Sequence, residues 1–171
     1  MAEVYPLPVR PITDRESAFA FVLGVLYNQQ TQGTRAWRAP YVLGQRMGGL
    51  TPERVMRLGP ARLGTLFAAK PAIHPFTQRM SLQTFAVARI ITEKYNGDAR
   101  NIWTPTVTAE VFVSRMMALP GIGEHKARIA LFVATVVLGV RVRRSSGNYS
   151  IRSCGSLAQI FHPIHEPKLT R

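Results

Sequence analysis

Cysteine is almost absent from this chain of 171 residues, in which Cys154 is the only one. One thiol excludes a disulfide within the chain, a cysteine-ligated iron–sulfur cluster and a cysteine-rich zinc site. Long apolar runs are missing too, because the longest, at residues 129–140, holds Thr135 and Gly139 and is too short to cross a bilayer. The first residues lack the basic and then apolar pattern of a secretion signal. We therefore expect a soluble, cytoplasmic protein with no membrane partner.

Acidic residues are also few, with 9 Asp and Glu against 22 Lys and Arg, which gives a net charge of +13. None lies between Glu124 and Glu166. Such an excess is typical of proteins that bind nucleic acids, and it predicts an affinity that falls steeply with salt. Basic surfaces also occur in ribosome-associated proteins, so the charge indicates a polyanionic partner and not a fold. We expect a phosphate backbone to lie along the basic residues of this acid-free stretch, which are Lys126, Arg128, Arg141, Arg143, Arg144 and Arg152.

Alternation of polar and apolar residues with period two does not recur, whereas Gly and Pro separate spans of ordinary helix length. The sequence therefore predicts an all-α fold. We expect one domain over residues 1–171, with a hairpin at 110–140 and a basic C-terminal tail at 141–171. The hydrophobic fraction of 46% is enough for a buried core. Helices are expected from Thr13 to Tyr27, at 34–47, from Pro52, at 60–67, 77–95, 110–118, 124–140 and 156–161.

Local signals mark several of these helix ends. Residues 13–16 have the spacing of a capping box, and Thr51 before a proline predicts an N-cap. The Asn-Gly pair at 96–97 predicts the end of the long helix. The first helix carries a wide apolar face, so we expect it to be mostly buried. It leads into residues 28–32, Asn-Gln-Gln-Thr-Gln, a polar cluster without an evident role in a core.

Residues 119–127 read Leu-Pro-Gly-Ile-Gly-Glu-His-Lys-Ala, the pattern of a helix-hairpin-helix that grips a DNA backbone. Its two glycines allow turn conformations closed to other residues, and they let backbone amides approach a phosphate. A helix begins just after the turn, and its N-terminal amides and dipole favour an anion there. Lys126 and Arg128 add positive charge to this helix. An ordinary glycine-rich corner between two helices is the alternative.

The order of these motifs resembles the helix-hairpin-helix base-excision DNA glycosylases, the superfamily of endonuclease III and the adenine glycosylase MutY. Residues 28–32 resemble the Gln-Gln-Thr-Gln segment of MutY-type enzymes, and residues 90–97 resemble a helix end in endonuclease III. The resemblance implies two helical lobes with DNA across the cleft, and an enzyme that flips out one nucleotide and cuts its glycosidic bond. A small bacterial and archaeal group within the superfamily is more similar still, at residues 41–46, 71–74, 119–128 and 149–153.

Nucleotide flipping requires a side chain that fills the space left in the base stack. Gln29 or Gln30 could do so, because an amide can hydrogen-bond to the orphaned base; an amide that braces the loop is the alternative. Tyr27 and His74 are the candidates for a base pocket. For His74, a structural imidazole bound to a backbone carbonyl is the alternative. A wider stacking wall could include Trp37, Phe76 and Tyr95.

Duplex DNA is the partner that the resemblance implies, for a protein that we expect to be monomeric and associated with the nucleoid. No metal and no cofactor are expected, although the backbone carbonyls of the hairpin could hold a monovalent cation. The residues expected to bind DNA, besides Gln29 and Gln30, are Gly121, Ile122, Gly123, Lys126, Arg128, Arg143 and Arg144.

The chain departs from the superfamily pattern at its catalytic positions. Bifunctional members carry a lysine two residues after the second hairpin glycine, where this chain has His125. Lys126 follows one position later, and one step along a helix is a rotation of about 100°. We therefore expect its side chain to point away from the catalytic position and to face phosphate, so Schiff-base lyase chemistry is not expected. A local shift that brings Lys126 inward is the alternative. His125 could contact the flipped base or a sugar-phosphate oxygen, or it could be an exposed surface histidine.

The aspartate with which superfamily members support the sugar cation is also missing, because residues 140–144 hold three arginines and no carboxylate. Val25 lies near the place of the glutamate in the adenine glycosylase. Asn28 could orient a water molecule but cannot act as a base. We predict a monofunctional glycosylase for a damaged or deaminated base, with His125 and Asn28 as catalytic candidates. A catalytically inactive lesion sensor and an accessory DNA-binding module are the alternatives.

Overall fold

The computed structural model describes residues 9–144, and within this range every regular element is a helix. The all-α prediction is thus confirmed for the described part of the chain. No helix in this range is long and apolar enough to cross a membrane. The elements are α1 (Arg15–Tyr27), α2 (Gly33–Met47), α3 (Pro52–Ala68), α4 (Thr77–Tyr95), the 3₁₀-helix η1 (Ala99–Ile102), α5 (Ala109–Met117), α6 (Glu124–Phe132) and the π-helical turn η2 (Val133–Val137).

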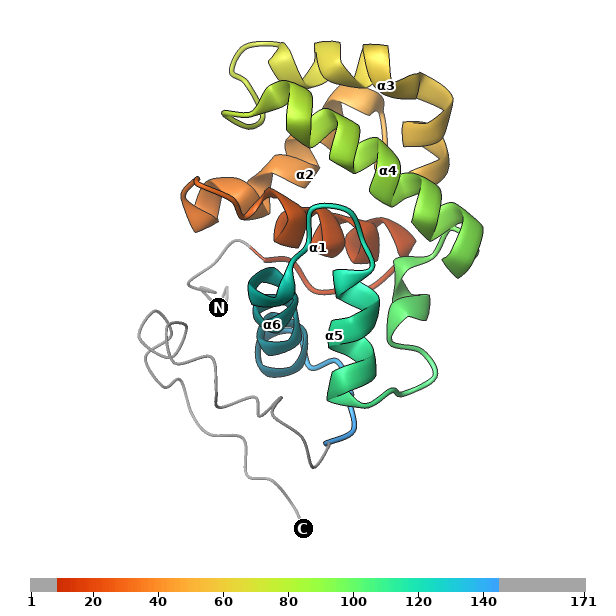
Figure 1. Ribbon diagram of the computed structural model, residues 1–171. Coiled ribbons are helices and arrows are strands. Elements are labelled where there is room, and N and C mark those ends of the chain that lie inside the picture. Colours follow the sequence, from red (N-terminus) through yellow and green to blue (C-terminus); the bar gives the residue numbers. More distant parts are fainter. Residues whose placement is uncertain (1–8, 145–171) are drawn as a thin grey trace.

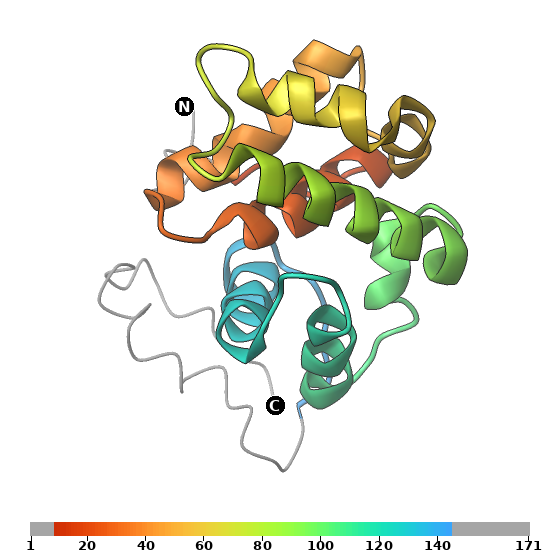
Figure 2. The ribbon, with the colours of Figure 1, turned by 45° about the horizontal axis from the view of Figure 1, so that its top comes forward.

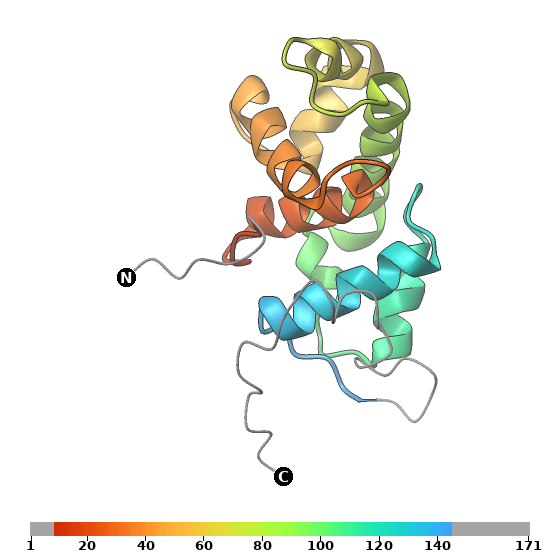
Figure 3. The same ribbon diagram turned by 90° about the vertical axis from the view of Figure 1, so that its left-hand side faces the viewer.

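Helix α1 lies between two groups of helices (Figure 1, Figure 3). We call α2, α3 and α4 the upper lobe, and α5 and α6 the lower lobe. Helices α5 and α6 lie side by side as a hairpin, with the turn at residues 118–123 between them (Figure 2). Every residue of α1 from Ala18 to Tyr27 is buried, so the helix has no polar face along this span. The expected burial of this helix is confirmed, and it serves as the shared core of both lobes.

Most helix ends lie where the local signals place them. The side chain of Thr51 caps α3, and α4 ends at Asn96, which has a left-handed φ of 53°. The capping box of α1 is formed by Asp14 and Ser17, one residue later than expected. The two helices expected on either side of Pro60 form one element with a kink at Gly59. The expected helix at 156–161 lies outside the described residues.

Helix α6 ends earlier than its apolar run suggests. Its α-helical part stops at Phe132, and η2 continues only to Val137. The chain then pairs with the start of α5, where the Arg143 N–H donates to the Val107 carbonyl at 2.8 Å. Residues 141–144 therefore lie at the end of the hairpin opposite to its turn (Figure 1). The length of α5 separates the two ends by about 13 Å.

Four arginines bind backbone carbonyls at the C-terminal ends of helices, where the helix dipole is negative. Arg46 donates to the carbonyls of Leu66, Ala69 and Pro71 at 2.6, 3.1 and 2.7 Å. Part of the positive excess is therefore used inside the fold and is not available to an external partner. The other three pairs are Arg15 with Gly97, Arg54 with Met47, and Arg115 with Asn101 and Ile102.

Replacement of Arg46 by methionine tests this use of charge. We expect the free energy of unfolding to fall by about 1–3 kcal/mol, because three carbonyls lose a charged donor. Arg38→Met on the same helix is the control, since Arg38 is exposed, and it should change the free energy by less than about 0.5 kcal/mol. Urea unfolding followed by circular dichroism measures both. Equal stability of the two variants would contradict the assignment.

Candidate nucleic-acid interface

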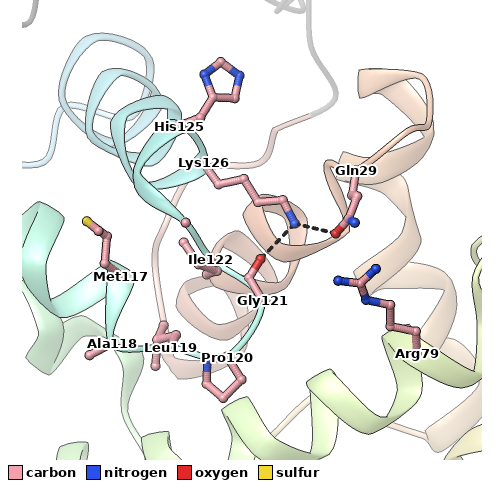
Figure 4. Close-up of a pocket in the computed structure, with 11 residues that line it drawn as sticks. Gln29, Arg79, Met117, Ala118, Leu119, Pro120, Gly121, Ile122, His125 and Lys126 are labelled. Carbon is pink, nitrogen blue, oxygen red and sulfur yellow. Dashed lines mark hydrogen bonds between the residues drawn. The ribbon is translucent and has the colours of Figure 1, made fainter.

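A surface pocket of about 650 Å³ opens between the hairpin turn, the end of α1 and the first turn of α4 (Figure 4). Three cationic or titratable side chains line it, and no carboxylate does. The pocket therefore combines a narrow backbone turn with positive charge from both lobes. Its lining residues are Gln29 at the end of α1, Arg79 on α4, residues 117–123 of the turn, and His125 and Lys126 on α6.

The turn is fixed by apolar anchors and by one glycine that the fold requires. Leu119 and Ile122 are 2% and 3% exposed, so their side chains hold the turn against the core. Gly121 has a φ of 80°, and a Cβ at this position would lie 2.7 Å from the amide atoms of Gln83 on α4. The positive φ thus calls for glycine at 121, and a Cβ would in addition displace the end of the Gln83 side chain. Ile122 can contribute to DNA binding only through its backbone.

Gly123 is different, because no contact or torsion angle within residues 9–144 calls for glycine there. Its φ of −84° and ψ of −179° are open to any residue, and a Cβ would meet no atom within 4 Å. Gly123 is also the N-cap of α6, and no side chain caps this helix. The first amides of α6 therefore face open space, as an anion would require.

Lys126 lies inward, contrary to the expected orientation. Its ammonium group donates to the Leu26 carbonyl at 2.8 Å, to the Gly121 carbonyl at 2.9 Å and to Gln29 Oε1 at 3.1 Å (Figure 4). Burial, with a smaller contribution from the charge of Arg79, lowers the pKa of Lys126 to about 8. The side chain thus joins α1 to the hairpin turn instead of extending into solvent from the face of α6.

The two catalytic candidates lie apart. His125 is exposed at the rim of the pocket, and its ring points away from Lys126 (Figure 4). Asn28 is the half-buried C-cap of α1, where its N–H donates to the Val25 carbonyl at 3.3 Å, and it does not line the pocket. The structure therefore brings Gln29, His125 and Lys126 together but leaves Asn28 outside this group.

Gln30 lies at the tip of the loop that follows α1. Its side chain is exposed, and its φ of 49° is rare for a residue other than glycine. Backbone strain of this kind costs energy and tends to occur at functional sites. The conformation presents the Gln30 side chain to solvent beside the pocket-lining Gln29.

Tyr27 and His74 do not form an open base pocket, so this interpretation is wrong for the structure described. Tyr27 is 0% exposed, its hydroxyl lies 2.9 Å from Thr84 Oγ1, and burial raises its pKa. His74 is 1% exposed, and its Nε2 lies 3.0 Å from the Tyr27 carbonyl. Because His74 Nδ1 accepts from the Phe76 N–H at 3.1 Å, Nε2 must carry the proton. The alternative of a structural imidazole is confirmed.

Phe76 is the large aromatic side chain that does reach the surface, with 41% exposure. Its ring lies 5.8 Å from that of His74, which in turn binds the carbonyl of Tyr27, directly before the Asn28–Gln30 loop. The buried histidine therefore fixes an exposed aromatic ring next to the loop that carries Gln29 and Gln30. Of the other candidates for a stacking wall, Trp37 is buried at 3% exposure.

The remaining arginine candidates do not surround the turn. Arg128 is paired with Glu124, its Nη2 lying 2.7 Å from Glu124 Oε1, and it does not line the pocket. Arg143 and Arg144 are exposed, but they lie at the opposite end of the hairpin. The structure therefore does not place the described arginines of the acid-free stretch beside the glycine turn, and Arg152 lies outside the described residues. The cation that does face the turn is Arg79, which no sequence motif had marked.

Comparison of the chain with models of protein families and with curated proteins finds no match. Within residues 9–144 no group of three or more His, Cys, Asp or Glu side chains could hold a metal ion. The expected monovalent cation at the hairpin carbonyls stays a prediction. The functional interpretation of the pocket consequently depends on its own geometry and chemistry.

The burial of His74 gives a testable dependence on pH. Burial lowers the pKa of His74 below the ordinary value of 6.5, so the unfolded chain takes up this proton first as the pH falls. The stability that the neutral His74 contributes to the folded protein is fully present above about pH 6.5, and it is lost as the pH falls toward the lowered pKa. Between pH 7 and 5 we expect His74→Leu to show a smaller loss of thermal stability than the wild type. Identical curves for His74→Leu and the wild type would contradict the role of His74.

Proposed function

We propose that this protein binds duplex DNA through the hairpin turn and acts as a monofunctional DNA glycosylase on a damaged or deaminated base. The observation that carries the proposal is Gly123, a glycine required by no contact or torsion angle of the free protein, at the uncapped start of α6. A missing Cβ there is useful to a ligand that approaches the backbone closely. A phosphate is such a ligand, because helix N-terminal amides donate to it.

The surroundings of the turn support an extended polyanion as the ligand. Arg79 and Lys126 contribute positive charge from opposite lobes, and His125 lies at the rim. The arrangement of two helical lobes around α1 is what the resemblance to the hairpin glycosylases implies. Duplex DNA across the pocket would touch both lobes at once.

Nucleotide flipping has suitable side chains next to this surface. Gln30 is exposed in a strained turn, and Gln29 lines the pocket. The exposed ring of Phe76 can stack on a base, an interaction worth about 1–3 kcal/mol per base. These groups are candidates for filling the space that a flipped nucleotide leaves.

The state of Lys126 supports hydrolysis over lyase chemistry. In the free protein its ammonium group donates to three oxygen acceptors, and an amine in this protonated form cannot attack a sugar carbon. In a hydrolytic reaction the imidazole of His125 is the group at the rim that can accept a proton. Asn28, the other predicted catalytic residue, does not line the pocket and has no part in this reaction. The protein would then release the base and leave the strand intact.

A catalytically inactive lesion sensor is the second candidate. The pocket lining has no carboxylate, and the described arginines at 141–144 lie at the far end of the hairpin. A glycosylase gains rate from negative charge beside the developing sugar cation. Without that charge, the same surface would bind a distorted duplex and not cut it.

A panel of duplexes with single lesions tests the two candidates. We expect the protein to convert at least one of uracil, oxidised guanine or an alkylated purine into an alkali-labile site. Borohydride should trap no covalent adduct, because the proposed nucleophile is water. Tight binding without base release would favour the lesion sensor. An adduct that Lys126→Met abolishes would contradict the monofunctional mechanism.

Gly123→Ala tests the hairpin without changing the charge. We expect about a tenfold or greater loss of affinity for duplex DNA, because the methyl group would stand where a phosphate approaches. Alanine is a poorer N-cap than glycine, so the unfolding temperature should fall slightly while the protein stays folded at the assay temperature. Gly64→Ala is the matched control, since its Cβ would make an ordinary contact of 3.7 Å with Ser81 Oγ, and it should bind as the wild type does. Fluorescence anisotropy measures both affinities. Unchanged affinity in Gly123→Ala would contradict the proposal.

A further inference from the structure

Arg79 faces the hairpin turn from the other side of the pocket. It belongs to the first turn of α4, and its guanidinium points toward Gln29 and Gly121 (Figure 4). It makes no hydrogen bond or ion pair with any residue in the described range 9–144. Arg79 is exposed, so its donors are open to a ligand that enters the pocket.

Arg79 and Lys126 are two like charges in one pocket. The charges and polar atoms that face Lys126 come from every element around it: Leu26 and Gln29 from the end of α1, the Gly121 carbonyl, Arg79 from α4, and His74 from the preceding loop. None of these side chains is a carboxylate. Repulsion between the two cations is therefore uncompensated within this group, and an anion between them would remove it.

The carboxamide oxygen of Gln29 occupies the position in which such an anion would accept a hydrogen bond from Lys126. Two acceptors of the Lys126 ammonium are backbone carbonyls and cannot leave without moving a helix or the turn. The third is the Gln29 side chain, whose Oε1 lies at 3.1 Å, the longest of the three distances. A phosphate oxygen carries more negative charge than a carboxamide oxygen, so it is the stronger acceptor for an ammonium group.

We propose that Arg79 and Lys126 together bind one phosphodiester group of the DNA backbone between the two lobes, and that this group displaces the Gln29 carboxamide from Lys126. The inference rests on the proposed DNA binding but concerns a second contact, which joins α4 of the upper lobe to Lys126 and is separate from the free amides of α6. Displacement releases Gln29 only when the backbone is in place. Contact with the backbone thus precedes insertion of the glutamine into the duplex.

The first experiment compares Arg79→Gln with Arg89→Gln, a control of the same charge on an exposed site ten positions further along α4. The probe is a duplex with a central tetrahydrofuran abasic analogue, and the affinity is measured by anisotropy between 50 and 200 mM salt. We expect Arg79→Gln to lose about tenfold in affinity. The slope of the logarithm of the binding constant against the logarithm of the salt concentration should become shallower by about one, as the loss of one phosphate contact requires. Arg89→Gln should keep the wild-type slope.

The second experiment follows Lys126 itself. The chain has four lysines, so ¹⁵N-lysine NMR resolves each side chain during a pH titration. Removal of the Arg79 charge should raise the pKa of Lys126 in the free protein, because less repulsion opposes its protonation. Addition of the duplex should raise the pKa in the wild type, and less so in Arg79→Gln. A merely structural Lys126 would titrate at the same pH with and without DNA.

Gln29→Ala separates displacement from simple phosphate binding. Without the competing carboxamide, affinity for an intact duplex should equal or exceed that of the wild type, while the preference for the abasic duplex falls. Normal binding and slope in Arg79→Gln, combined with loss of binding in Gly123→Ala, would overturn this inference and leave the proposed function standing. Failure of the wild-type protein to bind any duplex would overturn both. Thermal unfolding of each variant verifies that it is folded.

Discussion

The ammonium group of Lys126 makes the contact on which the geometry of the candidate site depends. It donates to the Leu26 carbonyl and the Gln29 side chain at the end of α1, which are 100 and 97 positions earlier in the sequence. It also donates to the Gly121 carbonyl in the hairpin turn. Because α1 is the shared core of both lobes, this one side chain sets how the turn faces the upper lobe. Its lowered pKa is the electrostatic consequence of a cation held between two lobes and beside Arg79.

Positive charge in this protein has two separate uses. Arg15, Arg46, Arg54 and Arg115 stabilise the C-terminal ends of helices, where carbonyl groups lack partners. Arg79 has no such partner in the described part of the chain and faces the pocket. The net charge therefore predicts that the protein attracts a polyanion, whereas the positions of the unpaired cations indicate where the polyanion can bind.

Glycine stands at the two hairpin positions for different physical reasons. Gly121 is needed by the fold, because its φ is positive, and a Cβ there would also displace the side-chain amide of Gln83. At Gly123 neither a positive φ nor a close contact within residues 9–144 calls for glycine, so the open space beside it is available to a ligand. The same distinction applies to the aromatic residues: Tyr27 fills the core, while Phe76 is held at the surface by the buried His74.

The sequence alone determined the all-α class, the bounds of α4 and the glycine turn, because caps, Asn-Gly ends and a Pro-Gly-apolar-Gly turn act over a few neighbouring residues. It also marked Gln29, Gln30 and the hairpin glycines as candidates. Only the tertiary structure decided that Lys126 turns inward, that Tyr27 is closed to a base and that Arg143 lies far from the turn. These outcomes depend on contacts between residues far apart in the chain, which local patterns do not encode. Arg79 illustrates this limit of local patterns, because its candidate role depends on the hairpin turn that lies across the pocket from it.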